Sequence, residues 1–233
     1  MGRASAGSVR AVLFDLDGTL FDHAGAAMEA LRTWLPTVGL EPDQESIARW
    51  FAAEERHVAR WRSGTVSWAE QRRNRLREVL PGAATRSPDE LDACFAGYLA
   101  RYEAAWRAFP DVAATLAELE AKELRLGVLT NGATAQQRAK LAALDLLDRF
   151  EFVLTAEDLG LAKPHLGSYL AACRRFDLEG AEVVHVGDLP DLDVAAPREA
   201  GLHAFLIDRD GRYEQAGALR SLRNLADRVA SLR

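Results

Sequence analysis

The stretch FDLDGTL at residues 14–20 ends a short apolar run that begins at residue 9. Such a run, bounded by turn residues, is typical of a strand buried on both faces of a parallel sheet. Because side chains alternate along a strand, Asp15 and Asp17 should leave the sheet on the same side, and Gly18 should let the chain bend sharply after them. Two carboxylates so close together repel each other unless a proton or a cation compensates, as a hard divalent ion with oxygen ligands does. The stretch therefore predicts a site for Mg²⁺.

Four more apolar runs predict the rest of a sheet, and they lie at residues 124–129, 150–154, 183–186 and 204–207. Helical patterns separate these runs, at residues 134–144, 167–176 and 191–200. Alternation of strands and helices is typical of an α/β fold with a doubly wound, mainly parallel sheet of the Rossmann-like kind. In that architecture the functional groups gather where the strands end.

The long stretch between the first two predicted strands, residues 22–109, contains no strand-like run. Its apolar residues recur at helical spacing, which predicts four or five amphipathic helices. Ser87 and Glu90 have the spacing of a capping box at the start of one of them. All five tryptophans fall in this stretch, and their spacing indicates that most of them pack in its interior.

These patterns divide the chain into two predicted domains. Residues 1–22 and 110–233 form the α/β core, and residues 23–109 form an inserted, all-helical domain. Within the core, residues 213–233 carry leucines at helical spacing and are predicted to pack on the sheet as a last helix.

Polar residues also follow the second and third predicted strands. Thr130, Asn131 and Gly132 stand at a strand-to-helix turn, where a hydroxyl and backbone N–H groups suit an anionic oxygen because the helix N-terminus adds positive potential. Lys163 precedes Pro164 after the third strand. Arginine is the usual cation of this chain, which has only three lysines, so this lysine is a candidate counter-charge for phosphoryl oxygens.

The fourth strand is followed by GDLPDLD at residues 187–193. Asp188 comes directly off the strand and can complete a metal shell, while Asp193 could hold metal-bound water or orient Lys163. Asp191 is expected to cap the following helix. Asp and Gly are common turn residues, so FDLDGTL alone is only moderately specific. The appearance of further polar groups after successive strands argues against coincidence.

Together these motifs resemble those of the haloacid dehalogenase-like superfamily of hydrolases, most of which are phosphatases. DLDGT, LTNG, the lysine of AKP and GDLPDLD occur in the order and spacing of that family, over nearly the whole chain. The helical insert resembles the family's cap domain of the type placed after the first strand. The chain departs from the pattern at Leu189 and Leu192, where many relatives carry a small hydroxyl residue and Asn, and at His165, where Asp is frequent.

The resemblance implies a Mg²⁺-dependent phosphatase that acts through an aspartyl-phosphate. Asp15 would attack phosphorus, while Asp17 would protonate the leaving oxygen and later activate water. The implied metal ligands are Asp15, Asp188 and Asp17, the last through its backbone carbonyl, with Asp193 close to the ion.

The resemblance also assigns residues to the substrate. Thr130 and Lys163 would hold the transferred oxygens, and Asn131, Gly132 and His23 are the candidate substrate contacts. His23 is included because the loop after the first motif and the helical domain should supply specificity, as a closing lid does. The expected partner is a small phosphorylated metabolite.

Several alternatives to a phosphatase arise from the same residues. A dehalogenase of the superfamily would share the Asp nucleophile but has no use for an acid two residues later, because a halide leaves unprotonated. A sugar phosphomutase keeps all of the motifs and stays open. A phospho-accepting receiver domain would carry its acceptor on a middle strand of a shorter chain, and a non-catalytic binding module would be expected to lose Asp15 or Asp17.

Composition restricts the class of partner. The net charge of −6 is spread over the chain without a charged tail, which argues against a nucleic-acid or anionic-membrane partner. No segment approaches the 18 apolar residues of a membrane span, and the first apolar run is too short for a signal-peptide core. We therefore expect a cytoplasmic monomer or homodimer.

Overall fold

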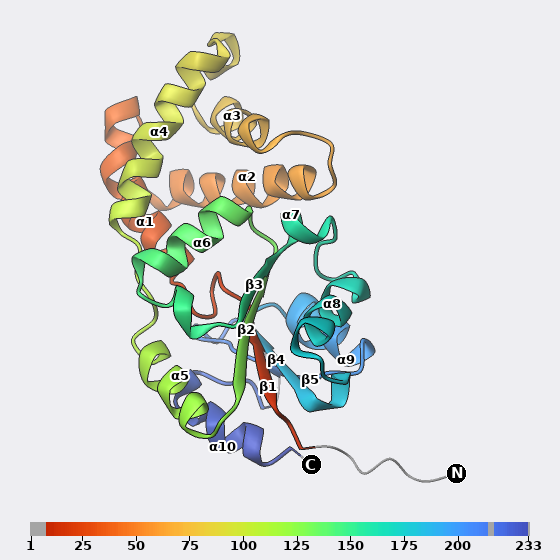
Figure 1. Ribbon diagram of the computed structural model, residues 1–233. Helices are drawn as coiled ribbons and strands as arrows, with labels where there is room; N and C mark the ends of the chain where they lie inside the picture. The colour runs from red at the N-terminus through yellow and green to blue at the C-terminus, as the bar shows by residue number, and fades with distance from the viewer. Residues whose placement is uncertain (1–7, 214–216, 233) are drawn as a thin grey trace. The chain divides into compact units, whose positions relative to one another are not determined.

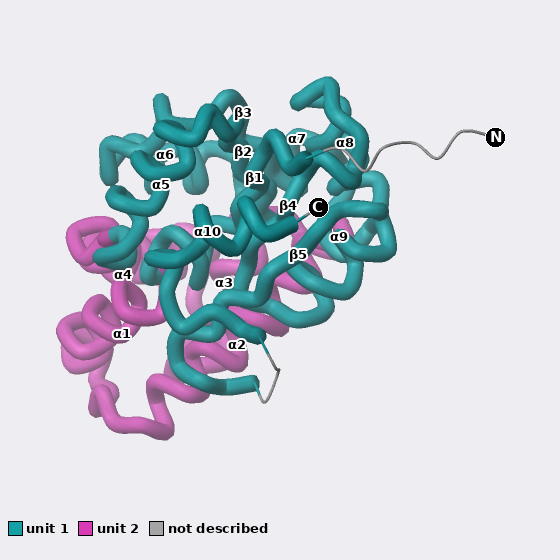
Figure 2. Tube along the Cα trace, turned by 90° about the horizontal axis from the view of Figure 1, so that it is seen from below, with its two compact units in different colours: residues 1–22, 108–233 teal, residues 23–107 magenta. Residues whose placement is uncertain are grey.

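The computed structural model describes residues 8–213 and 217–232. The chain forms two compact units, one made of residues 1–22 and 108–233 and the other of residues 23–107 (Figure 2). The boundaries predicted from the sequence lie after residues 22 and 109. Within the described part of the chain, no helix is both long enough and apolar enough to cross a membrane.

A five-stranded, all-parallel sheet forms the centre of the first unit, in the order β3-β2-β1-β4-β5 (Figure 1). Its strands are β1 (Ala11–Phe14), β2 (Arg125–Thr130), β3 (Phe152–Thr155), β4 (Val183–Gly187) and β5 (His203–Leu206). Each overlaps one of the five apolar runs of the sequence. The predicted doubly wound α/β fold is thereby confirmed.

The register of the central strand brings the strand ends to one edge of the sheet. Phe14 at the end of β1 pairs with Val128 of β2 and with Val186 of β4. All four residues of β1 are buried, as expected for a strand that has neighbours on both sides and helices on both faces. The residues that follow β1, β2 and β4 therefore emerge close together.

Helices cover both faces of this sheet (Figure 1). The helical segments of these two layers include α5 (Val112–Ala121), α6 (Thr134–Ala143), α8 (Leu166–Phe176), the π-helical segment η5 (Pro190–Ala195) and the short α9 (Ala196–Glu199). Figure 1 shows α8 and α9 on one side of the sheet and α5 and α6 on the other. Tyr169 and Phe176 of α8 pack against Leu13 and Leu129 in one buried apolar cluster. Short helical turns complete the unit at α7 (Ala156–Leu159), η3 (Leu147–Arg149) and η4 (Gly180–Glu182).

The end of the chain differs from the prediction of one helix over residues 213–233. Within the described residues of this stretch, the helical segments are η6 (Leu222–Asn224) and α10 (Leu225–Ala230). Leu219 forms a parallel bridge with Ile207, and the Asp208 carboxylate accepts the backbone N–H groups of Arg212 and Tyr213. These contacts satisfy backbone groups that a helix would otherwise use, so tertiary pairing overrides the leucine periodicity. Residues 214–216 and 233 lie outside the described chain.

The second unit is all-helical, as predicted. Its α-helices are α1 (His23–Trp34), α2 (Gln44–Arg62), α3 (Trp68–Val79) and α4 (Pro88–Ala104), with short 3-10 turns at η1 (Leu35–Val38) and η2 (Ala83–Thr85). The capping box of Ser87 and Glu90 is present at the start of α4. Trp34 and Trp50 are fully buried, and the Trp50 ring centroid lies 4.4 Å from that of Tyr98.

Candidate active site

The chain reverses its direction of winding beside the central strand. From β1 it continues to β2 and β3 on one side, and it then returns to β4 and β5 on the other side. In an open α/β sheet, ligands bind in the crevice at this switch point, outside the carboxyl ends of the strands. Asp15 directly follows β1 and Asp188 directly follows β4, so both stand at that point.

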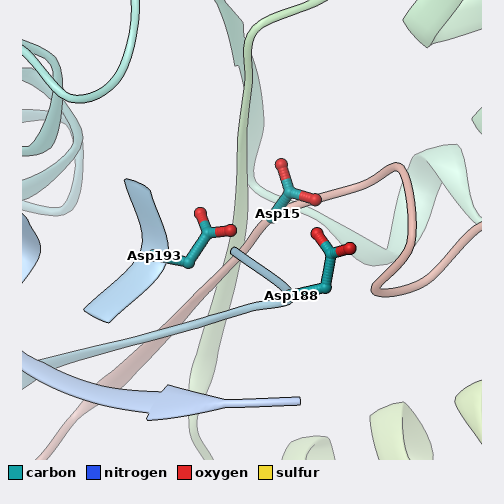
Figure 3. Close-up of side chains that lie close together, drawn as sticks. All are labelled: Asp15, Asp188 and Asp193. Carbon is teal, nitrogen blue, oxygen red and sulfur yellow. The ribbon is translucent and has the colours of Figure 1, made fainter. Parts of the chain in front are cut away.

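Three buried carboxylates meet there (Figure 3). Asp15, Asp188 and Asp193 each offer one oxygen, and these oxygens all lie within 4.8 Å of one another. Two glycines make the approach possible. A Cβ on Gly18, whose φ is +87°, would lie 2.4 Å from Asp188 Oδ2, and a Cβ on Gly187 would lie 2.2 Å from Asp193 Cγ. Neither glycine can be replaced without moving a carboxylate.

Lys163 is paired with two of these carboxylates. Its Nζ donates to Asp15 Oδ1 and to Asp193 Oδ1, at 2.7 Å in each case, and its side chain is 2% exposed. Burial disfavours the charged ammonium, but the two carboxylates outweigh burial and raise the pKa of Lys163. The counter-charge expected from the sequence therefore remains positive at neutral pH.

One ammonium does not compensate three buried carboxylates. Burial raises the pKa of Asp15 to about 8. The charges of Asp193 and Asp188 act in the same direction, whereas Lys163 acts against them. Burial together with the charge of Asp193 raises the pKa of Asp188 to about 6, although Arg212 works against this. Asp193 shifts in the opposite direction, because the attraction of Lys163 and His185 overcomes burial and holds its pKa well below the usual range.

This donor set fits a hard divalent cation. All three groups that converge are carboxylates, the ligands that Mg²⁺ prefers, and their mutual repulsion is relieved by either protons or a metal ion. Binding of a metal to such a site displaces protons. Asp15, Asp188 and Asp193 are therefore the carboxylates that could hold the ion.

The raised pKa values predict how pH acts on the stability of the metal-free protein. A carboxyl with a raised folded-state pKa contributes stability below its unfolded-state pKa, and this contribution is lost as pH rises through the folded-state value. For Asp15 and Asp188 the loss extends up to about pH 8 and about pH 6, respectively. Because the pKa of Asp193 is lowered, its protonation state changes only in strongly acidic solution.

We expect the free energy of unfolding of the metal-free wild type to fall between pH 5 and pH 9 more steeply than that of Asp15→Asn. Saturating Mg²⁺ should remove the difference in slope, because the metal replaces the protons. Urea unfolding at five pH values, with Mg²⁺ or with a chelator, measures both effects. Parallel pH profiles of the two proteins in chelator would contradict the raised pKa of Asp15.

Lys163 connects the turn after β2 to the carboxylate cluster. Asn131 accepts the backbone N–H of Lys163 at 2.7 Å and donates to its carbonyl at 2.8 Å, so the asparagine fixes the loop that carries the lysine. Thr130 is 2% exposed, and its hydroxyl accepts a hydrogen bond from Gln137 Nε2 at 2.7 Å. Gly132 packs against the side chain of the same glutamine, because a Cβ at this position would lie 2.4 Å from Gln137 Cδ.

Asp17 does not join the three clustered carboxylates through its side chain. Its Oδ1 accepts from Lys140 Nζ at 2.6 Å, and its Oδ2 accepts from Gln137 Nε2 at 2.8 Å. The sequence-based prediction placed its backbone carbonyl, rather than its carboxylate, on the metal. Neither Gln137 nor Lys140 was identified from the sequence. The available signal was their spacing of three residues on a predicted helix that starts just after Thr130.

Two other contacts of the cluster were also missed. His185 of β4 is fully buried and bonds to Asp193 Oδ1 at 2.9 Å, and Arg212 pairs with Asp188 at 3.2 Å. The alternation of side chains along β4 could have assigned His185 to one face of the sheet, but it could not have identified Asp193 as its partner. Asp193 also accepts the backbone N–H of Leu189 at 3.0 Å, and no side-chain cap from Asp191 starts the η5 segment. The expected cap role of Asp191 was therefore wrong.

The departures from the family pattern are accommodated through the backbone or by a local cap. Leu189 contributes its N–H to Asp193, and the Leu192 carbonyl accepts the hydroxyl of Tyr169. His165 caps α8, with Nδ1 accepting the N–H of Gly167 at 3.0 Å. These three positions thus keep ordered contacts.

His23 belongs to the helical unit, whereas the other predicted site residues belong to the α/β unit. Its Nδ1 lies 2.7 Å from the Tyr102 hydroxyl and its Nε2 lies 3.2 Å from Glu54. Glu54 also pairs with the buried Arg75 at 3.0 Å. His23 is thus part of a polar network between helices of its own unit, and its contact with substrate stays a prediction.

Comparison with known proteins places these observations in a family. The haloacid dehalogenase-like hydrolase family matches residues 9–201. The ribulose-1,5-bisphosphate 5-phosphatase of Halopiger xanaduensis is 32% identical over 228 residues, which cover 96% of this chain and 92% of that protein.

Solved structures show the same fold. The 2-haloacid dehalogenase of Pseudomonas syringae pv. Tomato is 31% identical, with a TM-score of 0.67 over 95% of this chain and 98% of that one. The HAD-hydrolase YfnB of Bacillus subtilis, whose structure contains magnesium, has a TM-score of 0.78 at 19% identity, covering 96% of this chain and 99% of that one. The relatives thus include both a phosphatase and a dehalogenase.

Proposed function

This chain belongs to the haloacid dehalogenase-like hydrolases, and from that premise we propose that it hydrolyses the phosphate monoester of a small metabolite with the help of Mg²⁺. The observation that carries the proposal is the buried cluster of Asp15, Asp188, Asp193 and Lys163 at the switch point of the sheet. The cluster would thus bring the proposed nucleophile and the proposed metal ligands together with a fixed cation.

In the first proposed step, an oxygen of Asp15 attacks phosphorus while the ester P–O bond breaks. Asp17 gives its proton to the leaving oxygen, and an aspartyl-phosphate remains. In the second step, water attacks phosphorus, Asp17 takes a proton from that water, and the P–O bond to Asp15 breaks. Inorganic phosphate leaves, and both carboxyl groups return to their starting state.

Other residues stabilise the transferred group. Lys163 is fully charged and held on two sides, so it can compensate charge on the phosphoryl oxygens without reorganising. Thr130 and the backbone of Gly132 would contact the same oxygens, while Asn131 keeps Lys163 in place. Held by Asp15, Asp188 and the Asp17 carbonyl, with Asp193 beside it, Mg²⁺ would supply further neutralisation of phosphoryl charge.

The choice of a phosphatase over a dehalogenase rests on Asp17. Phosphate esters of alcohols need a proton on the departing oxygen, whereas a departing halide needs none. Asp17 is fixed by two buried partners from α6, which supports a chemical role for its carboxylate rather than that of an ordinary turn residue. Asp188 supports the same choice, because it would complete an all-oxygen site for a divalent ion.

The purified protein is expected to release inorganic phosphate from 4-nitrophenyl phosphate with Mg²⁺ and to lose this activity with a chelator. A panel of sugar, nucleotide and small carboxylate phosphates then identifies the metabolite class. Chloride release from 2-chloropropionate serves as the competing assay, and isomerisation of a hexose phosphate tests for a mutase. Halide release without phosphate release would overturn the proposal, and so would metal-independent phosphate release.

A further inference from the structure

We propose that Lys140 and Gln137 are positioning residues that hold the carboxyl group of Asp17 in place while it transfers its proton to the leaving group. The inference rests on the proposed function, in which Asp17 is the general acid. It assigns a role to two buried polar residues of α6 that lie outside the motifs quoted from this sequence.

Each of the two residues donates a hydrogen bond to a different carboxylate oxygen of Asp17. Lys140 Nζ donates to Oδ1 at 2.6 Å and Gln137 Nε2 donates to Oδ2 at 2.8 Å. Residues three apart on a helix lie on the same face, so α6 presents both donors in one direction. A carboxylate held at both oxygens cannot rotate freely, whereas a side chain with one contact could.

The burial of Lys140 indicates that this contact is more than a surface ion pair. Its side chain is 3% exposed, and its Nζ lies 4.6 Å from the ring centroid of Phe21. Removing a lysine ammonium from water is unfavourable unless the ammonium is paired, so buried lysines are rare in protein interiors. Asp17, by contrast, has a side chain that is 33% exposed, so the buried lysine approaches the acid from the protein side and leaves the acid accessible.

Gln137 connects this acid to Thr130, which is proposed to contact the phosphoryl group. Its Nε2 carries two hydrogens, of which one goes to Asp17 and one to the Thr130 hydroxyl oxygen at 2.7 Å. A hydroxyl that accepts in this way can still donate its own proton to a phosphoryl oxygen. Gln137 is 1% exposed and packs closely on Gly132, so its amide has little room to move. The distance between the acid and the group that binds the phosphoryl oxygens is thereby fixed.

This arrangement predicts an effect that depends on the leaving group. Phenyl phosphate releases a weakly acidic phenol and needs protonation, whereas 2,4-dinitrophenyl phosphate releases a strongly acidic phenol and does not. For both esters kcat/KM reports the first transfer, from substrate to Asp15. A general acid contributes on the order of 10²–10⁴-fold, so Lys140→Met should lower kcat/KM for phenyl phosphate by about 10²-fold and for the dinitrophenyl ester by less than about 5-fold.

Matched variants separate positioning from a general loss of structure. Lys140→Arg should recover part of the activity on phenyl phosphate. If Lys140→Met does not fold, Gln137→Met should lower kcat/KM for both esters, because Gln137 also contacts the Thr130 hydroxyl, but more for phenyl phosphate than for the dinitrophenyl ester. Lys122→Met is the control, because Lys122 is 42% exposed and pairs only loosely with Asp227, at 3.9 Å. In an Asp17→Asn background, Lys140→Met should cause no further loss on phenyl phosphate.

Equal losses on both esters, or no loss on either, would overturn the positioning role while leaving phosphatase activity of the wild type intact. Absence of phosphate release by the wild type would instead remove the proposed function itself. The two failures are therefore distinguishable in one set of assays.

Discussion

Asp15→Asn is expected to remove essentially all phosphate release, by about 10⁴-fold or more in kcat, as is typical when a catalytic nucleophile is lost. The amide is a poor nucleophile, and it cannot form a stable acyl-phosphate with release of the alcohol. The fold should persist, because Asn keeps the size of the side chain and Lys163 retains its second partner, Asp193.

Asp191→Asn provides the matched control for this experiment, since Asp191 is an exposed aspartate three residues after Asp188. Its activity should stay within about twofold of the wild type, as for surface substitutions generally. Incubation with a phosphorylated substrate followed by acid quench and mass spectrometry should show phosphate on the wild-type peptide that contains Asp15. Turnover by Asp15→Asn at more than a tenth of the wild-type rate would exclude Asp15 as the nucleophile.

Much of this site was predictable because each motif stands at the end of a strand. Apolar runs located the strands, and parallel strands end at one edge of a sheet, so Asp15, Thr130 and Asp188 could be placed near one another from local patterns alone. Lys163 could be singled out because this chain so rarely uses lysine. Spacing along the chain was sufficient for these residues because the sheet itself brings them together.

The contacts from α6 were not predictable in the same way. Helical spacing shows that Gln137 and Lys140 share a face, but not that this face meets Asp17 more than a hundred residues earlier in the sequence. The need for a glycine at position 132 could not be predicted either. A larger residue there would collide with the side chain of Gln137, whereas the backbone angles of Gly132 do not themselves require glycine. The end of the chain illustrates the same limit, because the pairing of Leu219 with Ile207 replaced a helix that the leucine spacing indicated.

Lys163→Met should damage both stability and activity, because it removes the charge that two buried carboxylates share. Breaking a buried ion pair costs about 3–5 kcal/mol when one partner is left without compensation. Without Lys163, protonation of Asp15 becomes the remaining relief in the metal-free protein, so the destabilisation should be larger at pH 8 than at pH 5.5. Saturating Mg²⁺ should restore part of the stability, and phosphate release should still fall by about 10²–10³-fold, as when one transition-state donor is removed.

Urea unfolding of Lys163→Met and of the surface control Lys122→Met, at both pH values and with or without Mg²⁺, separates the contributions. The double variant Asp15→Asn with Lys163→Met tests the cause directly, because neutralising one carboxylate should offset part of the loss caused by removing the ammonium. Equal destabilisation at pH 5.5 and pH 8 would mean that lost packing of the lysine stem dominates. In that case the charge of Lys163 would matter for the phosphoryl group alone, and the metal-free fold would tolerate the three carboxylates by protonation.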